Sequence, residues 1–113
     1  MFRLNFFGKI YVHPKAQQTR AYQLNNNLVL NDKAIAQSKP HLEIFADDVK
    51  ATHGSTVGKL CEKQLFYLRS RGIPEAEARK ILIKGFNLEL VNQISFEPAR
   101  KMAEEITEKL LVS

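Results

Sequence analysis

Asp47, Asp48 and His53 are the side chains of this 113-residue sequence that could most readily do hydrolytic chemistry together. Paired carboxylates that face one cleft can serve as general acid and general base. Adjacent residues of one strand point to opposite faces, so the two aspartates converge only if they lie at a corner. A polar turn before a strand explains the same pair more simply. A hydrolase that uses Asp47 or Asp48 is therefore kept as an alternative, and the leading prediction is a protein without a catalytic residue.

His53 is the candidate that a purely structural interpretation explains least well. It stands between Thr52 and Gly54, and a glycine lets the backbone turn or approach a neighbour closely. An imidazole at this point could bind a metal ion transiently or relay protons near neutral pH. From the residues alone, a solvent-exposed or capping histidine is the simpler interpretation.

Cys61 is the single cysteine of the chain. One thiol cannot form an internal disulfide, complete a zinc site or ligate a whole iron–sulfur cluster. It also suits a reducing compartment. We therefore expect no stably bound cofactor in this chain.

Composition and charge narrow the function classes. Hydrophobic residues make up 44% of the chain, an ordinary share for a soluble globular protein. No apolar run approaches the roughly 20 residues that a membrane span needs, and the start lacks the pattern of a secretory signal. We expect a cytoplasmic protein with no membrane partner.

The formal net charge of +5 raises the question of nucleic-acid binding. The sequence has no run of basic residues, and its aromatic residues do not interleave with Lys or Arg as a stacking platform requires. No nucleic-acid partner is expected, and a basic nucleic-acid-binding module remains the second alternative.

The elements that must position these residues change in character near residue 60. Short β-prone triplets at 10–12, 28–30 and 44–46 are each followed by a polar segment, and the Lys-Ala pairs after them, at 15–16, 33–34 and 50–51, recur at a nearly constant interval. A fixed period of this kind predicts coils of a β-solenoid, with residues 25–27 (Asn-Asn-Asn) at a corner. An antiparallel sheet remains open as the alternative.

A solenoid coil buries its apolar residues only against neighbouring coils. The chain should therefore begin partway through a longer solenoid and expose an apolar end around Phe2, Leu4, Phe6 and Phe7. Such an end predicts self-association of this chain.

Residues 61–113 have the spacing of three helices. The first, at 62–71, ends at Gly72, with Ile73 as the apolar residue of a Schellman motif. The second starts at Pro74 and runs to about 93, with Gly85 explained by close helix packing, and Ser95 is expected to cap the third. The residues expected to face inward are Leu65, Phe66, Leu68, Ala78, Leu82, Phe86 and Leu90. The third helix has an apolar stripe that is expected to belong to the core or, because the helices are few, to dock a partner in part: Ala99, Met102, Ala103, Ile106 and Leu110.

Several stretches together resemble the SufB/SufD family of iron–sulfur cluster assembly proteins, in its SufD-like form. They are FGKI at 7–10, AQQT at 16–19, NNNL at 25–28, SKPHLEIFADDVK at 38–50, HGSTVG at 53–58 and QLFYLRSRGI at 64–73. The resemblance covers nearly the whole chain and matches the C-terminal part of longer family members.

This resemblance implies a fold and a function. The fold is mainly β plus α: residues 1–60 form the last coils of a right-handed parallel β-helix, and residues 61–113 form a helical domain of about three helices. The function is that of a non-catalytic scaffold, which pairs with a SufB-like subunit and docks a SufC-like ABC-type ATPase.

The resemblance also implies site residues. His53 matches a functional histidine at the interface with SufB, where transient binding of iron or of a nascent cluster is implied. The helical segment that includes Phe66, Tyr67 and Phe86 is implied to dock the ATPase. Ala51 stands where many relatives have a cysteine, so a thiolate ligand is missing there, and Cys61 is not expected to replace it.

Overall fold

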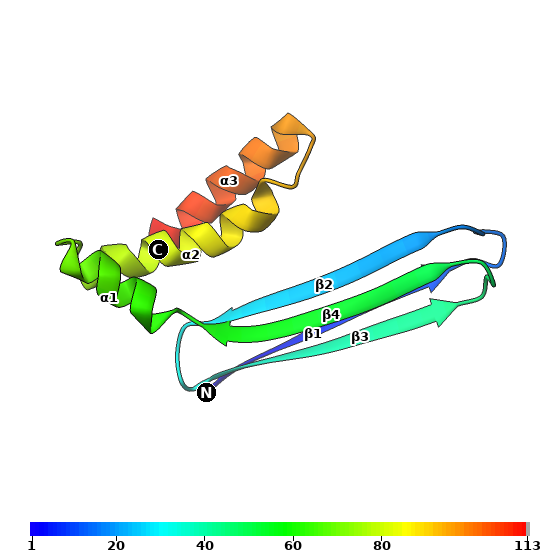
Figure 1. Ribbon diagram of the computed structural model, residues 1–113, viewed down its shortest axis with the longest axis horizontal. Coiled ribbons are helices and arrows are strands. Elements are labelled where there is room, and N and C mark those ends of the chain that lie inside the picture. The colour runs from blue at the N-terminus through cyan, green and yellow to red at the C-terminus, as the bar shows by residue number, and fades with distance from the viewer. Residues whose placement is uncertain (113) are drawn as a thin grey trace. The chain divides into compact units, whose positions relative to one another are not determined.

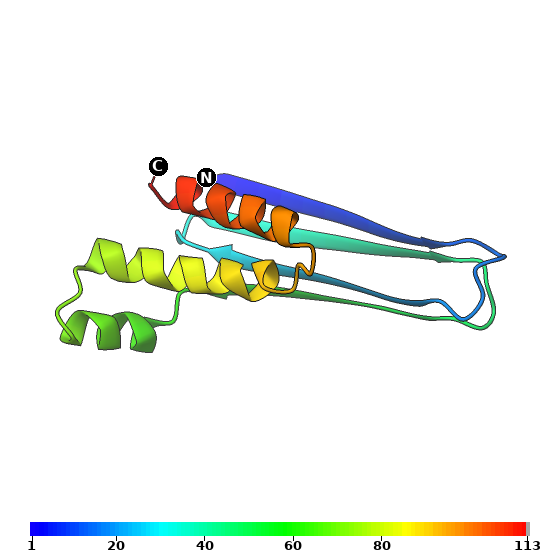
Figure 2. The ribbon, with the colours of Figure 1, turned by 90° about the horizontal axis from the view of Figure 1, so that it is seen from above.

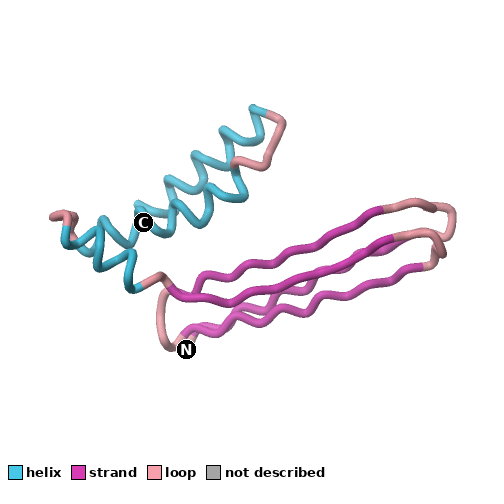
Figure 3. The backbone as a smooth tube through the Cα atoms, in the orientation of Figure 1, coloured by secondary structure: helices cyan, strands magenta, loops and turns pink. Residues whose placement is uncertain are grey.

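The computed structural model describes residues 1–112 of the chain, which divides into two compact units, Met1–Lys59 and a second that begins at Leu60 (Figure 1). The first unit contains four strands, and the second contains three helices (Figure 3). The last strand ends at Lys59, and the first helix begins at Glu62. No helix among residues 1–112 has the length and apolar character that crossing a membrane would take.

The strands of the first unit form two parallel pairs that run in opposite directions (Figure 1). They are β1 (Phe2–Val12), β2 (Arg20–Val29), β3 (Ala34–Ile44) and β4 (Lys50–Lys59). β1 pairs with β3, and β2 pairs with β4. Both pairs are parallel, so the alternative of an antiparallel sheet is wrong.

The stacking repeat is longer than the sequence pattern suggested. Phe2 pairs with Ala34 and Arg20 pairs with Lys50, so each strand skips its successor and stacks on the next strand but one. The shorter period of the triplets therefore marks successive strand ends rather than stacked positions. One repeat of the structure contains two strands and two corners. The chain must run back through a second strand before the following strand can stack on the first.

The corners stack as well as the strands. The backbone N–H of Phe45 donates to the carbonyl oxygen of Val12 at 3.0 Å, and that of Lys50 donates to the carbonyl oxygen of Thr19 at 2.9 Å. Val12 and Ala46 are buried at this end of the unit. The polar segments that follow the triplets therefore form ordered corners, and the described residues 1–112 show no closed solenoid.

We predicted a corner at the three consecutive asparagines, but they lie inside β2. Their side chains still bond across the stack. Asn27 Nδ2 donates to the carbonyl oxygen of Thr56 at 3.1 Å, and Thr56 Oγ1 donates to Asn26 Oδ1 at 2.8 Å. The side-chain ladder follows from the parallel register of β2 and β4.

Apolar side chains are exposed at the start of β1, as expected. Phe2 is 81% exposed, Leu4 60% and Phe7 66%, whereas Phe6 is half-buried. Self-association of the chain through this end stays a prediction.

The helices of the second unit are α1 (Glu62–Ser70), α2 (Glu75–Val91) and α3 (Glu97–Val112). α2 and α3 lie side by side and run in opposite directions (Figure 2). Gly72 has φ of +89°, and the N–H groups of Gly72 and Ile73 donate to the carbonyl oxygens of Arg69 and Leu68. These two bonds form the predicted Schellman motif.

The helical faces agree with the predicted ones only in part, because Leu65 and Ala78 are buried as expected whereas other residues are not. Phe66 and Leu90 are exposed, and so are the residues of the α3 stripe, which are Ala99, Met102, Ile106 and Leu110, with Ala103 half-buried. The buried helical residues are Leu65, Ala78, Val91 and Thr107. With only three helices, one narrow face of each is covered, so the apolar residues beside that face stay in contact with solvent.

Two smaller predictions for the helices are wrong. A Cβ added at Gly85 would meet no atom within 4 Å, so this glycine does not serve close packing. Phe96, and not Ser95, precedes the first residue of α3, while Pro98 does occupy the first turn.

Candidate functional site

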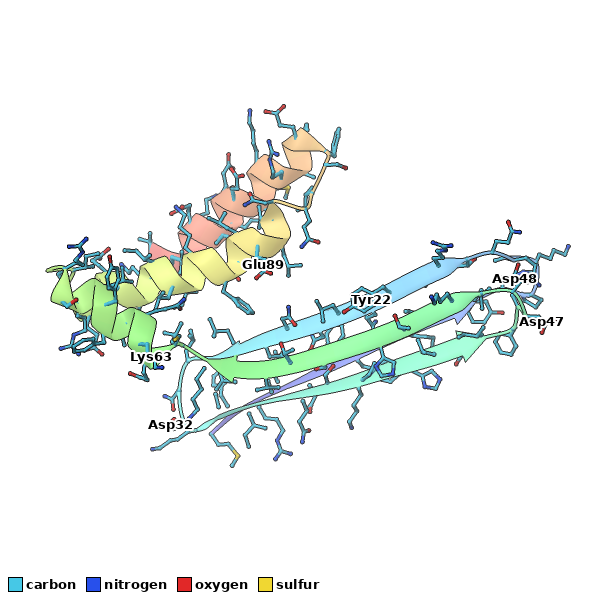
Figure 4. All side chains as sticks on the ribbon, viewed as in Figure 1. Tyr22, Asp32, Asp47, Asp48, Lys63 and Glu89 are labelled. Atoms are coloured by element: carbon cyan, nitrogen blue, oxygen red, sulfur yellow. The ribbon has the colours of Figure 1, made fainter. Side chains whose placement is uncertain are left out.

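Asp47 and Asp48 lie in the polar corner between β3 and β4 (Figure 4). The backbone N–H of Asp48 donates to Oε1 of Gln17 in the neighbouring corner, at 2.9 Å. β4 begins at Lys50, so His53 lies three residues, about 10 Å, further along that strand. The two aspartates and the histidine do not share one site, and no contact among residues 1–112 favours the hydrolase alternative.

We expected His53 at a turn, but it lies in the middle of β4. A Cβ added at Gly54 would contact Leu24 Cδ1 and Tyr22 Oη, and both of these side chains are well exposed. Gly54 therefore faces outward, and His53 faces the opposite way, towards the second pair of strands. Its in-register neighbour on β2 is Gln23, whose side chain points to the same face.

The interior beside His53 contains polar and small residues. Gly8 is buried on β1, and a Cβ there would clash with Nε2 of Gln23. The amide of Gln23 thus spans the space between the two pairs of strands. Pro40 is the in-register neighbour of Gly8, and the ring of Phe6 also lies against Gly8.

His53 is exposed even though it faces inward, since among residues 1–112 β4 pairs only with β2. No group of three or more His, Cys, Asp or Glu side chains that could hold a metal ion occurs in the described part of the chain. Cys61 is exposed, outside β4, at the start of α1. Ala51 lies two residues before His53 and hence on the same face, where it offers no ligand atom. A metal ion bound at His53 would need its other ligands from elsewhere.

A second polar cluster lies on the outer face of β1 and β3, where the sequence indicated none. Lys9 Nζ is 3.0 Å and His41 Nε2 is 3.3 Å from Glu43 Oε1. The hydrogen bond from Lys9 is the main reason why the pKa of the Glu43 carboxyl lies below its usual value. The ring of Phe7 stacks on that of His41, with centroids 6.3 Å apart. The cluster joins two strands that are far apart in the sequence, so only their register reveals it.

Aromatic and basic residues do alternate on this outer face, contrary to the expectation from the sequence. Phe7, Lys9 and Tyr11 share one face of β1, and the Tyr11 and Phe45 rings lie 5.4 Å apart. The ammonium of Lys9 is already paired with Glu43. This outer face therefore presents aromatic rings, but the ammonium of Lys9 between them is not free to bind a ligand.

The three side chains implied in ATPase docking have different environments. Phe66 is 74% and Tyr67 56% exposed, and both lie on α1, where the Arg71 guanidinium is 5.6 Å from the Tyr67 ring centroid. Phe86 lies on α2 and is half-buried. The structure exposes an aromatic pair on α1 and leaves Phe86 half-buried on α2.

Comparison with known proteins identifies relatives over most of the chain. Residues 3–86 match the family described as SUF system FeS cluster assembly, SufBD core domain. The chain is 49% identical over 89 residues to an iron–sulfur cluster assembly SufBD family protein of Synechocystis, which covers 79% of the chain and 20% of that protein. It is 44% identical over 95 residues to the iron–sulfur cluster assembly protein SufD of Escherichia coli, covering 84% of the chain and 22% of the relative.

The SufD protein of Bacillus subtilis is 38% identical over 105 residues, which cover 93% of the chain and 24% of that protein. The chain thus spans about a fifth to a quarter of the length of these relatives.

Proposed function

The chain belongs to the SufBD core-domain family, and on that premise we propose that it acts as a SufD-like, non-catalytic scaffold in iron–sulfur cluster assembly. The observation that carries this proposal is the match of residues 3–86 to the family, together with 44% identity to a protein named SufD. The names of these relatives support a part in iron–sulfur cluster assembly.

The strand unit is proposed to form the last coils of a right-handed parallel β-helix. Two features support this: the unbroken parallel register along the whole of β1 and β3, and the stacking of successive corners. The exposed apolar side chains of Phe2 and Leu4 fit a surface that a further coil covers.

His53 is proposed to bind iron or a nascent cluster transiently, at the interface with a SufB-like subunit. Its imidazole is accessible on the inward face of β4, and Ala51 on that face supplies no ligand. A single imidazole holds a metal ion weakly, so the remaining ligands would come from the partner subunit. The iron or cluster is here cargo and not a resident cofactor.

Replacement of His53 tests this role. His53→Ala in a strain that lacks the native subunit should abolish the activity of cluster-dependent enzymes while the complex still co-purifies. The side chain is exposed, so its loss should cost about 0.5 kcal/mol or less of stability. His41→Ala, which removes an exposed histidine of β3, is the matched control and should complement normally. Normal cluster enzymes in the His53→Ala strain would show that His53 has no role in assembly.

The helical unit is proposed to dock a SufC-like ABC-type ATPase. Phe66 and Tyr67 form an exposed aromatic pair, and such side chains are frequent anchors at protein interfaces. Deletion of residues 62–113 should abolish co-purification of the ATPase and preserve pairing with the SufB-like subunit. Phe66→Ser should weaken ATPase binding at least tenfold, whereas Phe45→Ser, at an exposed ring of the strand unit, should not. Retention of the ATPase after the deletion would refute this division of roles.

A further inference from the structure

Two buried polar atoms of the strand unit have no protein partner. They are Oε1 of Gln23 on β2 and Oγ of Ser38 on β3, and neither forms a hydrogen bond with another atom of residues 1–112. Buried polar atoms in native proteins are normally paired, and internal water supplies the partner where protein groups do not. The two atoms belong to different pairs of strands, so a partner must lie between the layers.

The space around Gln23 Oε1 is lined by Gly8 and by the ring of Phe6. Gly8 and Pro40 are in register, and the amide of Gln23 lies against Gly8. Ser38 is two residues before Pro40, on the same face of β3 and about 7 Å along the strand. Oε1 of Gln23 and Oγ of Ser38 therefore both face the space between the two pairs of strands.

His53 stands beside this space. It is the in-register neighbour of Gln23 on a strand about 4.8 Å away, and both side chains face inward. A nitrogen of the imidazole ring on that side can therefore form a hydrogen bond with the same water molecule as Gln23.

We propose that Gln23 and Ser38 hold ordered water in the interior of the strand unit, and that this water binds the inward nitrogen of His53. The water would donate its two hydrogens to Gln23 Oε1 and Ser38 Oγ and accept the N–H of that nitrogen, which fixes the tautomer and the orientation of the ring. The lone pair of the other nitrogen would then remain available to a metal ion, as is usual for histidine ligands with a hydrogen-bonded second nitrogen. Gln23 is thus a positioning residue for His53. Only the relevance to cluster assembly rests on the proposed function, because the water site itself does not depend on it.

Nitrogen NMR of the 113-residue chain tests the inference directly. With ¹⁵N-labelled histidine, the ring nitrogens of His13, His41 and His53 report their tautomers separately, and the first two serve as internal references. One tautomer of His53 should dominate at a pH where the ring is neutral. Gln23→Leu should reduce this preference about fivefold, the equivalent of one ordinary hydrogen bond. Gln37→Leu, the same change at an exposed position of β3, should leave it unaltered.

Ser38→Ala is the second variant, since it removes one oxygen and should be tolerated where Gln23→Leu fails to fold. It should also reduce the tautomer preference of His53. A crystal structure of the chain should show water within about 3.2 Å of both Gln23 Oε1 and Ser38 Oγ. Unchanged tautomers in the folded variants, or an interior without that water, would overturn the inference. Neither result would touch the complementation test of His53, so the two proposals can fail separately.

Discussion

The strand unit depends on pairing between strands that are not neighbours in the sequence, whereas the helical unit depends on signals between residues a few positions apart. Each strand of residues 1–59 pairs with a strand that is not its neighbour in the sequence, and the space between the two pairs of strands contains Gly8 and Gln23. The helices are set by local signals, such as the glycine at φ +89° after α1. Both units bury few side chains and expose many apolar ones, so this property does not distinguish them. The strand unit should therefore be sensitive to single interior changes, and the helical unit to changes at its helix ends.

Gly8→Ala should show the largest effect on stability. The new Cβ would lie 2.7 Å from Gln23 Cδ and 2.8 Å from Phe6 Cε1, both closer than unstrained contacts. Overpacking of this kind costs about 1–3 kcal/mol. Hydrogen exchange of peptides from β1 and β2 should accelerate, while peptides from the helical unit should not change.

A second substitution identifies the cause of that effect. Gln23→Ala in the Gly8→Ala background should recover part of the lost stability, because it removes the amide that the Cβ meets. Gly58→Ala, at a strand glycine whose Cβ would meet nothing within 4 Å, is the matched control. Equal effects of Gly8→Ala and Gly58→Ala would contradict the distinction between interior and edge glycines.

Local features of the chain were predictable from the sequence, and features that depend on register were not. The Schellman motif at Gly72 and the polar corner at Asp47 follow from residues a few positions apart. The place of His53 within a strand, and its pairing with Gln23, depend on the stacking of β4 on β2, which the triplet period concealed. Family resemblance pointed to His53 but could not tell which face of β4 it occupies.

The exposed position of Phe66 illustrates a second limit. Its helical spacing fits an inward face as well as an outward one, and only the packing of α1 on α2 through Leu65 decides between them. The same holds for the α3 stripe, where Thr107 is buried although Ile106 is the more apolar residue. The spacing of apolar residues shows how wide the apolar face of a helix is. It does not show which part of that face a neighbouring helix covers.

Two glycines of the helical unit should respond in opposite directions to the same substitution. Gly85→Ala should raise stability by about 1 kcal/mol, because the Cβ meets nothing within 4 Å and alanine favours the helix. Gly72→Ala should lower it by about 1 kcal/mol, since a side chain at φ +89° is strained. Hydrogen exchange of helical peptides at increasing urea concentration would measure the change in the free energy of unfolding for both variants. A loss of stability in Gly85→Ala would mean that an undetected contact covers this face of α2.

The smallest expected effect is the pH dependence of an exposed ion pair at the edge of the strand unit. Lys59 Nζ lies 2.5 Å from Asp32 Oδ1 and connects the end of β4 to the segment between β2 and β3. The hydrogen bond from Lys59 holds the pKa of Asp32 below its ordinary value of 3.8, and the same bond raises the pKa of Lys59 above 10.5. A lowered carboxyl pKa contributes stability above the unfolded value, and this contribution is lost as the pH falls through the folded pKa. A raised lysine pKa contributes stability below 10.5 that is lost as the pH rises through the folded pKa.

The pair should therefore stabilise the unit between about pH 4 and pH 10 only, and weakly, since both side chains are exposed. Asp32→Asn should lower the melting temperature by about one degree at pH 7 and by nothing measurable at pH 2, whereas Asp47→Asn should have no such pH-dependent effect. Thermal unfolding of the three proteins at both pH values measures the difference. A difference that persists at pH 2 would show that Asp32 acts through the shape of its loop and not through its charge.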